Sequence, residues 1–268
     1  MPTLMAVHAH PDDEAIQTGG VLVMAARRGI RTVLVTCTNG EMGDLPDGLK
    51  PEAPGHDAAA TSAVRLGELQ AAARELSIGH LELLGYRDSG MMGWPQNDAP
   101  ESFWRAPLDQ VTARVEELME QYRPEVVITY DANGLYGHPD HIQAHRATFA
   151  AADLTGIPQK IYEIALPRSQ MKAFAEMQRE AGVGSAQDDP GGDFGTPDEL
   201  ITTTVDVSSA WEAKRAAAFA HASQMANFDF LKIDPDLLQV AMSREHFVRA
   251  FDRTGAPLPE TDLFAGVA

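Results

Sequence analysis

Residues 3–14 read TLMAVHAHPDDE, and the interpretation of the whole chain starts from this stretch. Its first part, 3–9, is a short apolar run that predicts a buried strand. Helical periodicity follows from about Glu14 to Arg28 and stops at Gly29, a residue type that commonly ends helices. A buried strand that passes through a polar turn into a helix is typical of a parallel α/β sheet.

The segments that follow repeat this strand–helix alternation. Further strands are predicted at 31–38, 80–84, 125–131 and 160–166, with helices at about 60–77, 108–122 and 139–153. Strands that alternate with helices indicate an α/β fold with a mainly parallel sheet and helices on both faces.

The last hundred residues have a different pattern. The Gly- and Asp-rich stretch 182–197 is interpreted as a linker or mobile loop. After it we expect a strand at 202–207, a helix at 208–224 and a helical tail. The chain is therefore divided into a catalytic core, 1–168, and a smaller C-terminal α+β extension, 169–268, packed on the core as one globular unit.

Composition limits the partners of this protein. The 268 residues carry a formal net charge of −18, which repels nucleic acids and anionic membranes. The single cysteine, Cys37, excludes an internal disulfide and is expected to be a buried, inert thiol. The sequence contains neither an apolar run of the ~18 residues needed to span a bilayer nor a basic segment ahead of an apolar one. We therefore expect a cytoplasmic protein; the sequence is compatible with a homo-oligomer.

Two similar clusters of polar residues follow predicted strands. His10-Pro11-Asp12-Asp13 comes directly after the first strand, and His138-Pro139-Asp140-His141 follows the strand at 125–131. Ligands of open parallel sheets bind beyond the carboxyl ends of the strands, so both clusters are expected at the same edge and can meet there. For either cluster alone, the simpler explanation is a helix cap formed by Asp12 or Asp140.

The chemistry of the two clusters is complementary. A catalytic zinc ion takes three nitrogen or oxygen ligands and keeps one position open for water, and two histidines with a carboxylate meet that requirement. Zinc lowers the pKa of its bound water to about 7, and a nearby carboxylate can accept the proton. Fe²⁺ also suits two histidines and a carboxylate. The sequence therefore predicts a metal-dependent hydrolase.

Other histidines and motifs provide alternatives. His8 shares a strand face with His10 and would allow a dinuclear phosphoesterase or amidohydrolase, although a hydrogen-bonded core histidine is the simpler interpretation. His145, four residues after His141, is expected to support the site rather than bind metal. The sequence lacks the G-x-G-x-x-G, G-x-x-x-x-G-K-[ST], G-x-S-x-G and H-E-x-x-H motifs, which disfavours nucleotide-binding, serine-hydrolase and zinc-protease functions.

The two motifs together resemble those of a known family. AHPDDE at 9–14 and TYDANGLYGHPDH at 129–141 are similar to the PIG-L/LmbE-type zinc-dependent N-acetylglucosaminide deacetylases. That family includes deacetylases of mycothiol and bacillithiol precursors and amidases of mycothiol conjugates. The resemblance covers about the first 165 residues and continues more weakly into 211–224. It implies a Rossmann-like fold and one zinc ion per chain.

The resemblance also implies roles for individual residues. His10, Asp13 and His141 correspond to the zinc ligands, and Asp12 corresponds to the general base that activates water. His138 corresponds to the histidine that stabilises the oxyanion and protonates the leaving amine. Further expected roles are tuning of His138 by Asp140, closure over the substrate and carbonyl polarisation by Tyr136, and contacts to sugar hydroxyls by Asp44, Arg65 and Asp88.

The chain departs from the mycothiol deacetylases in two places, 15–20 (AIQTGG) and 94–104 (WPQNDAPESFW). The aromatic residues Trp94, Phe103 and Trp104 of the second stretch are expected either to stack on a sugar or an acyl chain, or to pack on the core. We predict a deacetylase that removes an N-acetyl or other N-acyl group from a glucosamine-containing small molecule. An amidase of mycothiol S-conjugates, the dinuclear enzyme above and a non-enzymatic binding module remain as alternatives.

Overall fold

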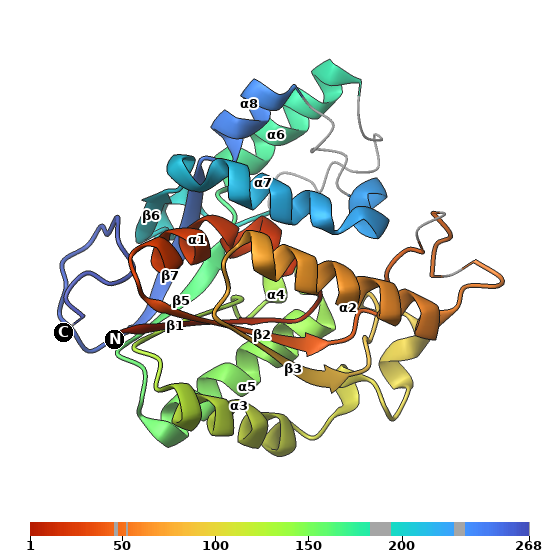
Figure 1. The fold of residues 1–268 in the computed structure, drawn as a ribbon, viewed down its shortest axis with the longest axis horizontal. Coiled ribbons are helices and arrows are strands. Elements are labelled where there is room, and N and C mark those ends of the chain that lie inside the picture. Colours follow the sequence, from red (N-terminus) through yellow and green to blue (C-terminus); the bar gives the residue numbers. More distant parts are fainter. Residues whose placement is uncertain (46–47, 52, 183–193, 228–233, 268) are drawn as a thin grey trace.

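The computed structural model describes residues 1–45, 48–51, 53–182, 194–227 and 234–267. They form one seven-stranded sheet in the order β3–β2–β1–β4–β5–β7–β6 (Figure 1). The first five strands in the chain pair in parallel, which confirms the predicted mainly parallel sheet. The strands are β1 (Thr3–His8), β2 (Arg31–Thr38), β3 (His80–Tyr86), β4 (Val126–Thr129), β5 (Lys160–Ala165), β6 (Thr203–Asp206) and β7 (Arg244–Asp252).

Helices cover both faces of the sheet, as predicted. In Figure 1, α1, α2 and α7 lie above the sheet and α3 and α5 lie below it. The helices are α1 (Gly19–Arg27), α2 (Ala58–Glu75), α3 (Leu108–Tyr122), α4 (Gly134–Gly137), α5 (Pro139–Thr155), α6 (Arg168–Ala181), α7 (Trp211–Ala220) and α8 (Pro235–Ala241). Shorter helical segments are η1 (Glu14–Thr18), η2 (Pro95–Asp98), η3 (Phe103–Arg105), η4 (Asp198–Leu200), η5 (Ser208–Ala210) and η6 (Ala222–Asn227).

The topology places the site between β1 and β4. All six residues of β1 are buried, as expected for a central parallel strand that is covered on both faces. Leu4 of β1 pairs with Val126 of β4. The strand order reverses between these neighbours, and open α/β sheets bind ligands at the carboxyl ends of strands at such a point. Both sequence clusters begin there.

The predicted helical tail is wrong in its second half. After α8 the chain forms β7, which pairs antiparallel with both β5 and β6. The sequence of β7, REHFVRAFD, buries Glu245 and Phe247 on one side but is rich in charged residues, so its local pattern is weak for a strand. Pairing with β5, about 80 residues earlier in the chain, determines this strand, and local propensity cannot reveal it.

The predicted linker 182–197 falls largely outside the described residues, because 183–193 are among those left out. Its end returns to the sheet, where the backbone N–H of Thr196 donates to the carbonyl of Leu166 at 2.7 Å. Among the described residues, no helix is long and apolar enough to cross a membrane.

Candidate active site

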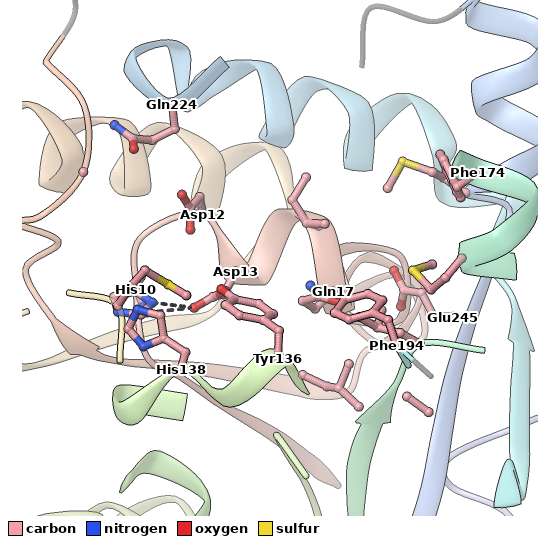
Figure 2. A pocket seen from close by; sticks show the side chains of 18 of the residues that line it. His10, Asp12, Asp13, Gln17, Tyr136, His138, Phe174, Phe194, Gln224 and Glu245 are labelled. Carbon is pink, nitrogen blue, oxygen red and sulfur yellow. Dashed lines mark hydrogen bonds and ion pairs between the residues drawn. The ribbon is translucent and has the colours of Figure 1, made fainter. Parts of the chain in front are cut away.

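The two polar clusters meet in space although they lie about 130 residues apart in the chain. The ring centroids of His10 and His138 are 4.5 Å apart, those of His10 and His141 are 5.3 Å apart, and those of His138 and His141 are 4.8 Å apart. His10 follows β1, whereas His138 caps the N-terminus of α5. Figure 2 shows His10, Asp13 and His138 together at one end of a pocket.

Asp13 lies between two of these histidines. Its Oδ2 atom is 3.4 Å from His10 Nδ1 and 3.6 Å from His141 Nε2. The same oxygen accepts hydrogen bonds from the backbone N–H of His10 at 2.9 Å and from the Tyr130 hydroxyl at 2.6 Å. Burial opposes ionisation of Asp13, but the charge of His141 and the hydrogen bond of His10 hold its pKa well below the ordinary value. Asp13 is therefore an anionic carboxylate in a fixed position, with an oxygen that could bind a metal ion.

The two distances from Asp13 match the spacing between neighbouring donors of a tetrahedral metal ion. Metal–ligand bonds of about 2.0–2.2 Å at tetrahedral angles separate neighbouring donor atoms by about 3.3–3.6 Å. Both ring nitrogens of His141 are buried without a hydrogen-bond partner. Buried polar atoms are nearly always satisfied, so unpaired nitrogens on a buried ring suit a residue that binds a metal ion.

More than one donor set can be drawn from this cluster. Donor atoms of His10, His138 and His141 all lie within 4.8 Å of one another, and so do those of His10, Asp88 and Asp140. His10 belongs to both sets, which are the groups of this kind found among the described residues. These donors could hold a metal ion beside His10, and both the ion and its exact ligands stay a prediction.

Asp12 combines an unusual backbone with a perturbed carboxyl group. Its φ of 125° lies in a region that non-glycine residues rarely adopt. Burial raises the pKa of Asp12 to about 6, against the opposing charge of Arg65. Arg65 Nη2 donates to Asp12 Oδ2 at 2.9 Å. A carboxylate that titrates near neutral pH is suited to accept a proton in catalysis.

His138 has one ring nitrogen fixed by the backbone. Its Nδ1 atom accepts a hydrogen bond from the backbone N–H of Asp140 at 3.2 Å, which leaves Nε2 as the nitrogen that carries a proton. Burial lowers the pKa of His138 well below its ordinary value, and the neighbouring histidines add to this effect. His138 is thus a neutral N–H donor, and it caps α5, whereas neither Asp12 nor Asp140 is a helix cap.

The carboxylate of Asp140 faces His10 rather than the His138 ring. Asp140 Oδ2 is 3.3 Å from His10 Nε2 and accepts a hydrogen bond from the backbone N–H of Ser89 at 2.9 Å. The expectation that Asp140 tunes His138 stays a prediction, and the contact that the structure gives between the two is the backbone hydrogen bond above. The first turn of α5 directs the carboxylate across to the end of β1, so that it holds the nitrogen of His10 opposite Asp13.

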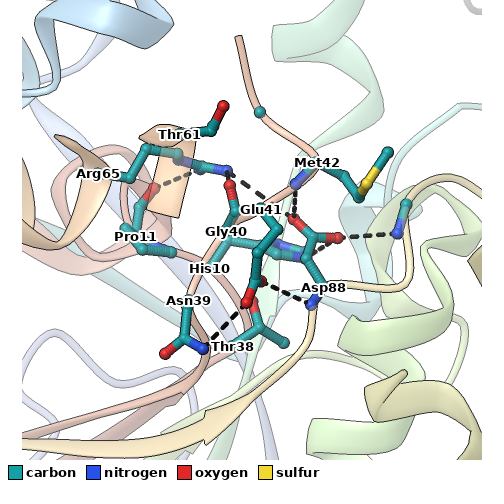
Figure 3. Close-up of polar contacts among 12 residues, drawn as sticks. His10, Pro11, Thr38, Asn39, Gly40, Glu41, Met42, Thr61, Arg65 and Asp88 are labelled. Atoms are coloured by element: carbon teal, nitrogen blue, oxygen red, sulfur yellow. Dashed lines mark hydrogen bonds and ion pairs between the residues drawn. The ribbon is translucent and has the colours of Figure 1, made fainter. Parts of the chain in front are cut away.

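The three predicted sugar-binding residues are buried beside the cluster and line the cavity. Arg65 donates to the carbonyls of Pro11 at 2.6 Å and Gly40 at 2.9 Å (Figure 3). Asp88 Oδ1 lies 3.7 Å from His10 Nε2, and Asp44 pairs with Lys50 at 2.6 Å. Arg65 is therefore buried rather than on the surface, and the hydrogen bonds above join it to other residues of the protein.

The cavity has a volume of about 1000 Å³ and two unlike parts. Tyr136 lies between the histidine cluster and an apolar part that includes Phe174 and Phe194 (Figure 2). The Tyr136 side chain is 45 % exposed, and its ring centroid is 5.2 Å from that of His141. Leu135 beside it has a φ of 63°. Tyr136 thus stands on a strained turn at the mouth of the polar part.

The aromatic residues of the 94–104 stretch divide between the cavity and the core. Trp94 lines the cavity. Phe103 is buried, with its ring centroid 5.0 Å from that of Tyr86, and Trp104 lies under the guanidinium of Arg146. Of the three, Trp94 has the place expected of a residue that stacks on a ligand.

His8 and His145 have protein partners. His8 Nε2 is 2.8 Å from the Thr18 hydroxyl, and His8 is a buried core histidine outside both metal-donor sets. His145 Nδ1 is 2.9 Å from the carbonyl oxygen of Tyr130. Both observations agree with the simpler interpretations and disfavour a second metal held by His8.

Sequence reasoning missed four residues that support the cluster. Tyr130 donates to Asp13, and its ring stacks on His141 with centroids 4.0 Å apart. His221 pairs with Glu14 at 2.7 Å, and Gln224 bonds the loop that carries Asp44. A tyrosine that ends an apolar strand beside a metal motif could have been suspected. The other contacts join residues about 180–207 positions apart and have no local signal.

Comparison with known proteins identifies relatives over the full chain. The family model "PIG-L: GlcNAc-PI de-N-acetylase" matches residues 5–152. The 1D-myo-inositol 2-acetamido-2-deoxy-α-D-glucopyranoside deacetylase of Acidothermus cellulolyticus is 41% identical over 280 residues, covering 99% of this chain and 95% of the relative.

Solved structures with this fold perform more than one reaction. The N,N′-diacetylchitobiose deacetylase of Pyrococcus horikoshii matches with a TM-score of 0.58 and 20% identity over 92% of this chain and 83% of that one. The 4-carboxy-2-hydroxymuconate hydratase GalB of Pseudomonas putida matches with a TM-score of 0.62 and 19% identity over 96% and 100%. The fold alone therefore does not decide the reaction, which has to be argued from the site and the sequence relatives.

Proposed function

Because this chain belongs to the PIG-L (GlcNAc-PI de-N-acetylase) family, we propose that its substrate is 1D-myo-inositol 2-acetamido-2-deoxy-α-D-glucopyranoside. The chain is a deacetylase, that is, a hydrolase that removes the acetyl group from an N-acetylglucosamine-containing small molecule. The inositol glycoside is the substrate named for relatives that match nearly the whole chain at 36–41% identity. The observation that carries the proposal is the buried His10–Asp13–His141 cluster at the end of a large cavity.

We assign one zinc ion per chain to His10, Asp13 and His141. Asp13 belongs to neither of the two donor sets above, but its Oδ2 atom lies 3.4 Å from His10 Nδ1 and 3.6 Å from His141 Nε2, and the unpaired nitrogens of His141 also support the assignment. Asp140 adds a further argument, because metal-binding histidines commonly hold a carboxylate with their second ring nitrogen, and His10 Nε2 lies 3.3 Å from Asp140. A bound zinc ion would polarise the amide carbonyl and lower the pKa of water to about 7. Fe²⁺ fits the same donors.

Asp12 is assigned as the general base. It sits between two proposed ligands in sequence, lines the cavity and titrates at about 6, so it is ionised at neutral pH. Arg65 fixes one oxygen of its carboxylate at 2.9 Å. Asp12 then accepts the proton of the attacking water as the C–O bond forms.

His138 and Tyr136 are assigned to the substrate carbonyl. His138 Nε2–H is the free donor of a ring whose other nitrogen is held by the Asp140 backbone, so it can donate to the developing oxyanion. Tyr136 stands at the mouth of the polar part of the cavity, where its hydroxyl can reach the same oxygen. The amine leaves with the proton that Asp12 took from the water, because the neutral His138 ring has no spare proton to give.

Asp44, Arg65 and Asp88 are assigned to the sugar hydroxyls. Carboxylate and guanidinium groups are strong hydrogen-bonding partners, and these three side chains are buried in the cavity wall beside the metal cluster. Trp94 adds an aromatic surface to the same part of the wall. A cavity of about 1000 Å³ is large enough for a two-ring glycoside.

The apolar part of the cavity supports one second candidate. Met171, Phe174, Phe194 and Met242 line it, and a polyol such as inositol makes little use of such a wall. If the enzyme is an amidase of S-conjugates, the apolar group of its substrate would fill this part.

An amine-release assay of the zinc-loaded protein distinguishes the candidates. We expect rapid release of amine from the N-acetylglucosaminyl inositol and slower release from N-acetylglucosamine and from an aromatic mycothiol S-conjugate. A higher kcat/KM for the conjugate would favour the amidase, and no amine release from any of the three would contradict the proposed function.

A further inference from the structure

We infer that Glu14 and His221 form a positioning pair that holds the backbone of Asp12 in its strained conformation. Through this pair the C-terminal region would control the turn 10–13, which we call the catalytic turn. The inference rests on the proposed role of Asp12 as general base. It assigns a function to two buried ionisable residues that the mechanism above does not use.

The backbone of Asp12 needs restraint from outside. Its φ of 125° lies beyond the left-handed region that aspartate tolerates, at φ of about 50–70°. Such conformations persist only where surrounding contacts overdetermine them. The backbone N–H of Asp12 donates to Glu14 Oε2 at 3.0 Å, and its carbonyl accepts from the backbone N–H of Ala15 at 3.1 Å. Two side chains thus bind the Pro11–Asp12 peptide: Glu14 accepts from its N–H, and Arg65 donates to its carbonyl at 2.6 Å.

Glu14 is itself held by His221. Both side chains are fully buried, and His221 Nε2 lies 2.7 Å from Glu14 Oε1. Each carboxylate oxygen therefore has one assigned task, Oε2 on Asp12 and Oε1 on His221. A buried carboxylate without a donor would be costly, so His221 keeps Glu14 in the place where it can bind Asp12.

His221 belongs to a turn that reaches three separate parts of the core. The backbone N–H of Ser223 donates to Glu68 of α2 at 2.7 Å. Gln224 Nε2 donates to the carbonyl of Asp44 at 3.0 Å. Together with the Glu14 contact, these bonds tie the turn 221–224, which follows α7, to the catalytic turn, to α2 and to the loop that carries Asp44.

Glu14 and His221 act through Asp12 rather than on the substrate. Neither lines the cavity, and neither side chain has exposed surface. Loss of the pair is therefore expected to lower kcat, because small displacements of a reacting group are expensive: a shift of about 1 Å can cost ~10²-fold in rate. KM should change little, since the cavity wall is left intact.

The test compares His221→Ala, His221→Gln and Glu14→Gln by kcat, KM and bound zinc. We expect His221→Ala to lose ~10²-fold in kcat with KM and zinc retained. His221→Gln keeps an N–H donor for Glu14 and should recover most of that loss. Glu14→Gln should resemble His221→Ala, because the amide replaces one of the two accepting oxygens by an NH2 donor, so that Asp12 and His221 no longer each face an acceptor. Since both changes break one chain of contacts, the double variant should be no slower than the slower single variant.

A matched control is Glu260→Gln, which removes a charge from a buried pair with Lys160, and neither residue lines the cavity. It should lower stability as much as His221→Ala and leave kcat unchanged. A His221→Ala enzyme with the kcat of the parent, or multiplicative losses in the double variant, would overturn the inference.

A crystal structure of His221→Ala tests the inference without any substrate. We expect Asp12 to leave φ near 125° and its carboxylate to move from Arg65. An unchanged Asp12 would contradict the inference, whatever the activity assays show. Failure of the parent enzyme on every substrate, with the backbone of Asp12 shifted in the variant, would reject the proposed function and keep the positioning pair.

Discussion

Two buried polar clusters lie along the same sheet and differ in how their atoms are satisfied. Where β5 meets β7, Glu260 accepts from Lys160, from Arg249 at 2.9 Å and from the Tyr162 hydroxyl at 2.7 Å. At the ends of β1 and β4, both ring nitrogens of His141 and one oxygen of Asp140 have no partner. Backbone strain is also found at this second place, at Asp12 and in the turn before His138.

This difference indicates which cluster stabilises the fold and which one serves the reaction. An unpaired buried polar atom costs about 1–3 kcal/mol, so a fold tolerates several of them together only where something else completes their bonding. The Glu260 cluster is complete and fixes β7 and the chain end to β5. The His10 cluster leaves several buried atoms without a partner, which is why we assign the metal ion and the chemistry to it.

The largest expected effect is that of Asp12→Asn. General acid–base groups contribute about 10²–10⁴-fold to rate, so kcat should fall by that range while zinc stays bound. Steady-state kinetics of protein with measured zinc content checks this. A variant that keeps more than a tenth of the parent kcat would show that Asp12 is not the base.

Glu260→Gln should have the opposite profile. Removing one partner of a buried ion pair typically costs about 3–5 kcal/mol of folding free energy, because the other charge is left buried. Urea unfolding should show that loss, with kcat per folded molecule unchanged. A loss of kcat without a loss of stability would mean that the Glu260 cluster contributes to catalysis rather than to folding.

The pH dependence of the reaction should report Asp12. Its pKa of about 6 lies above the ordinary value because of burial, so the base becomes protonated as the pH falls through 6. We expect kcat/KM of the free enzyme to fall about tenfold per pH unit below that point and to be level just above it. A pH–rate profile with its acidic limb near pH 4 would point to a solvated carboxylate instead.

The smallest effect is expected for His8→Gln. His8 shares hydrogen bonds with Thr18 and Tyr130 and belongs to neither donor set, so its replacement should cost about 1 kcal/mol of stability. Zinc content and kcat should stay at the parent values. Loss of one of two bound metal ions would instead support the dinuclear enzyme.

The sequence was informative where the chemistry is local. The strand β1, the turn after it and the helical start at Pro139 follow from short patterns, and the parallel topology then places His10 beside His141. The motif also indicates which residues could hold a metal, because two histidines and a carboxylate are the ligand types that a catalytic zinc ion takes.

What the sequence could not show depends on contacts between distant segments. Glu14 reads as an ordinary first-turn acid, and His221 as a lone histidine near the end of a helix, until the fold places them 2.7 Å apart. The direction of the Asp140 carboxylate depends on how α5 meets β1. The division at residue 168 remains a prediction, and β7 extends the sheet of the core directly.

The most direct test of the metal assignment is zinc bound per chain, measured by equilibrium dialysis with elemental analysis, for the parent and for His141→Ala. We predict one zinc ion per parent chain and at least a hundredfold weaker binding in His141→Ala, because the variant loses one of three protein ligands. A parent chain that binds two zinc ions or none, or a His141→Ala variant that binds one zinc ion as tightly as the parent, would contradict the account.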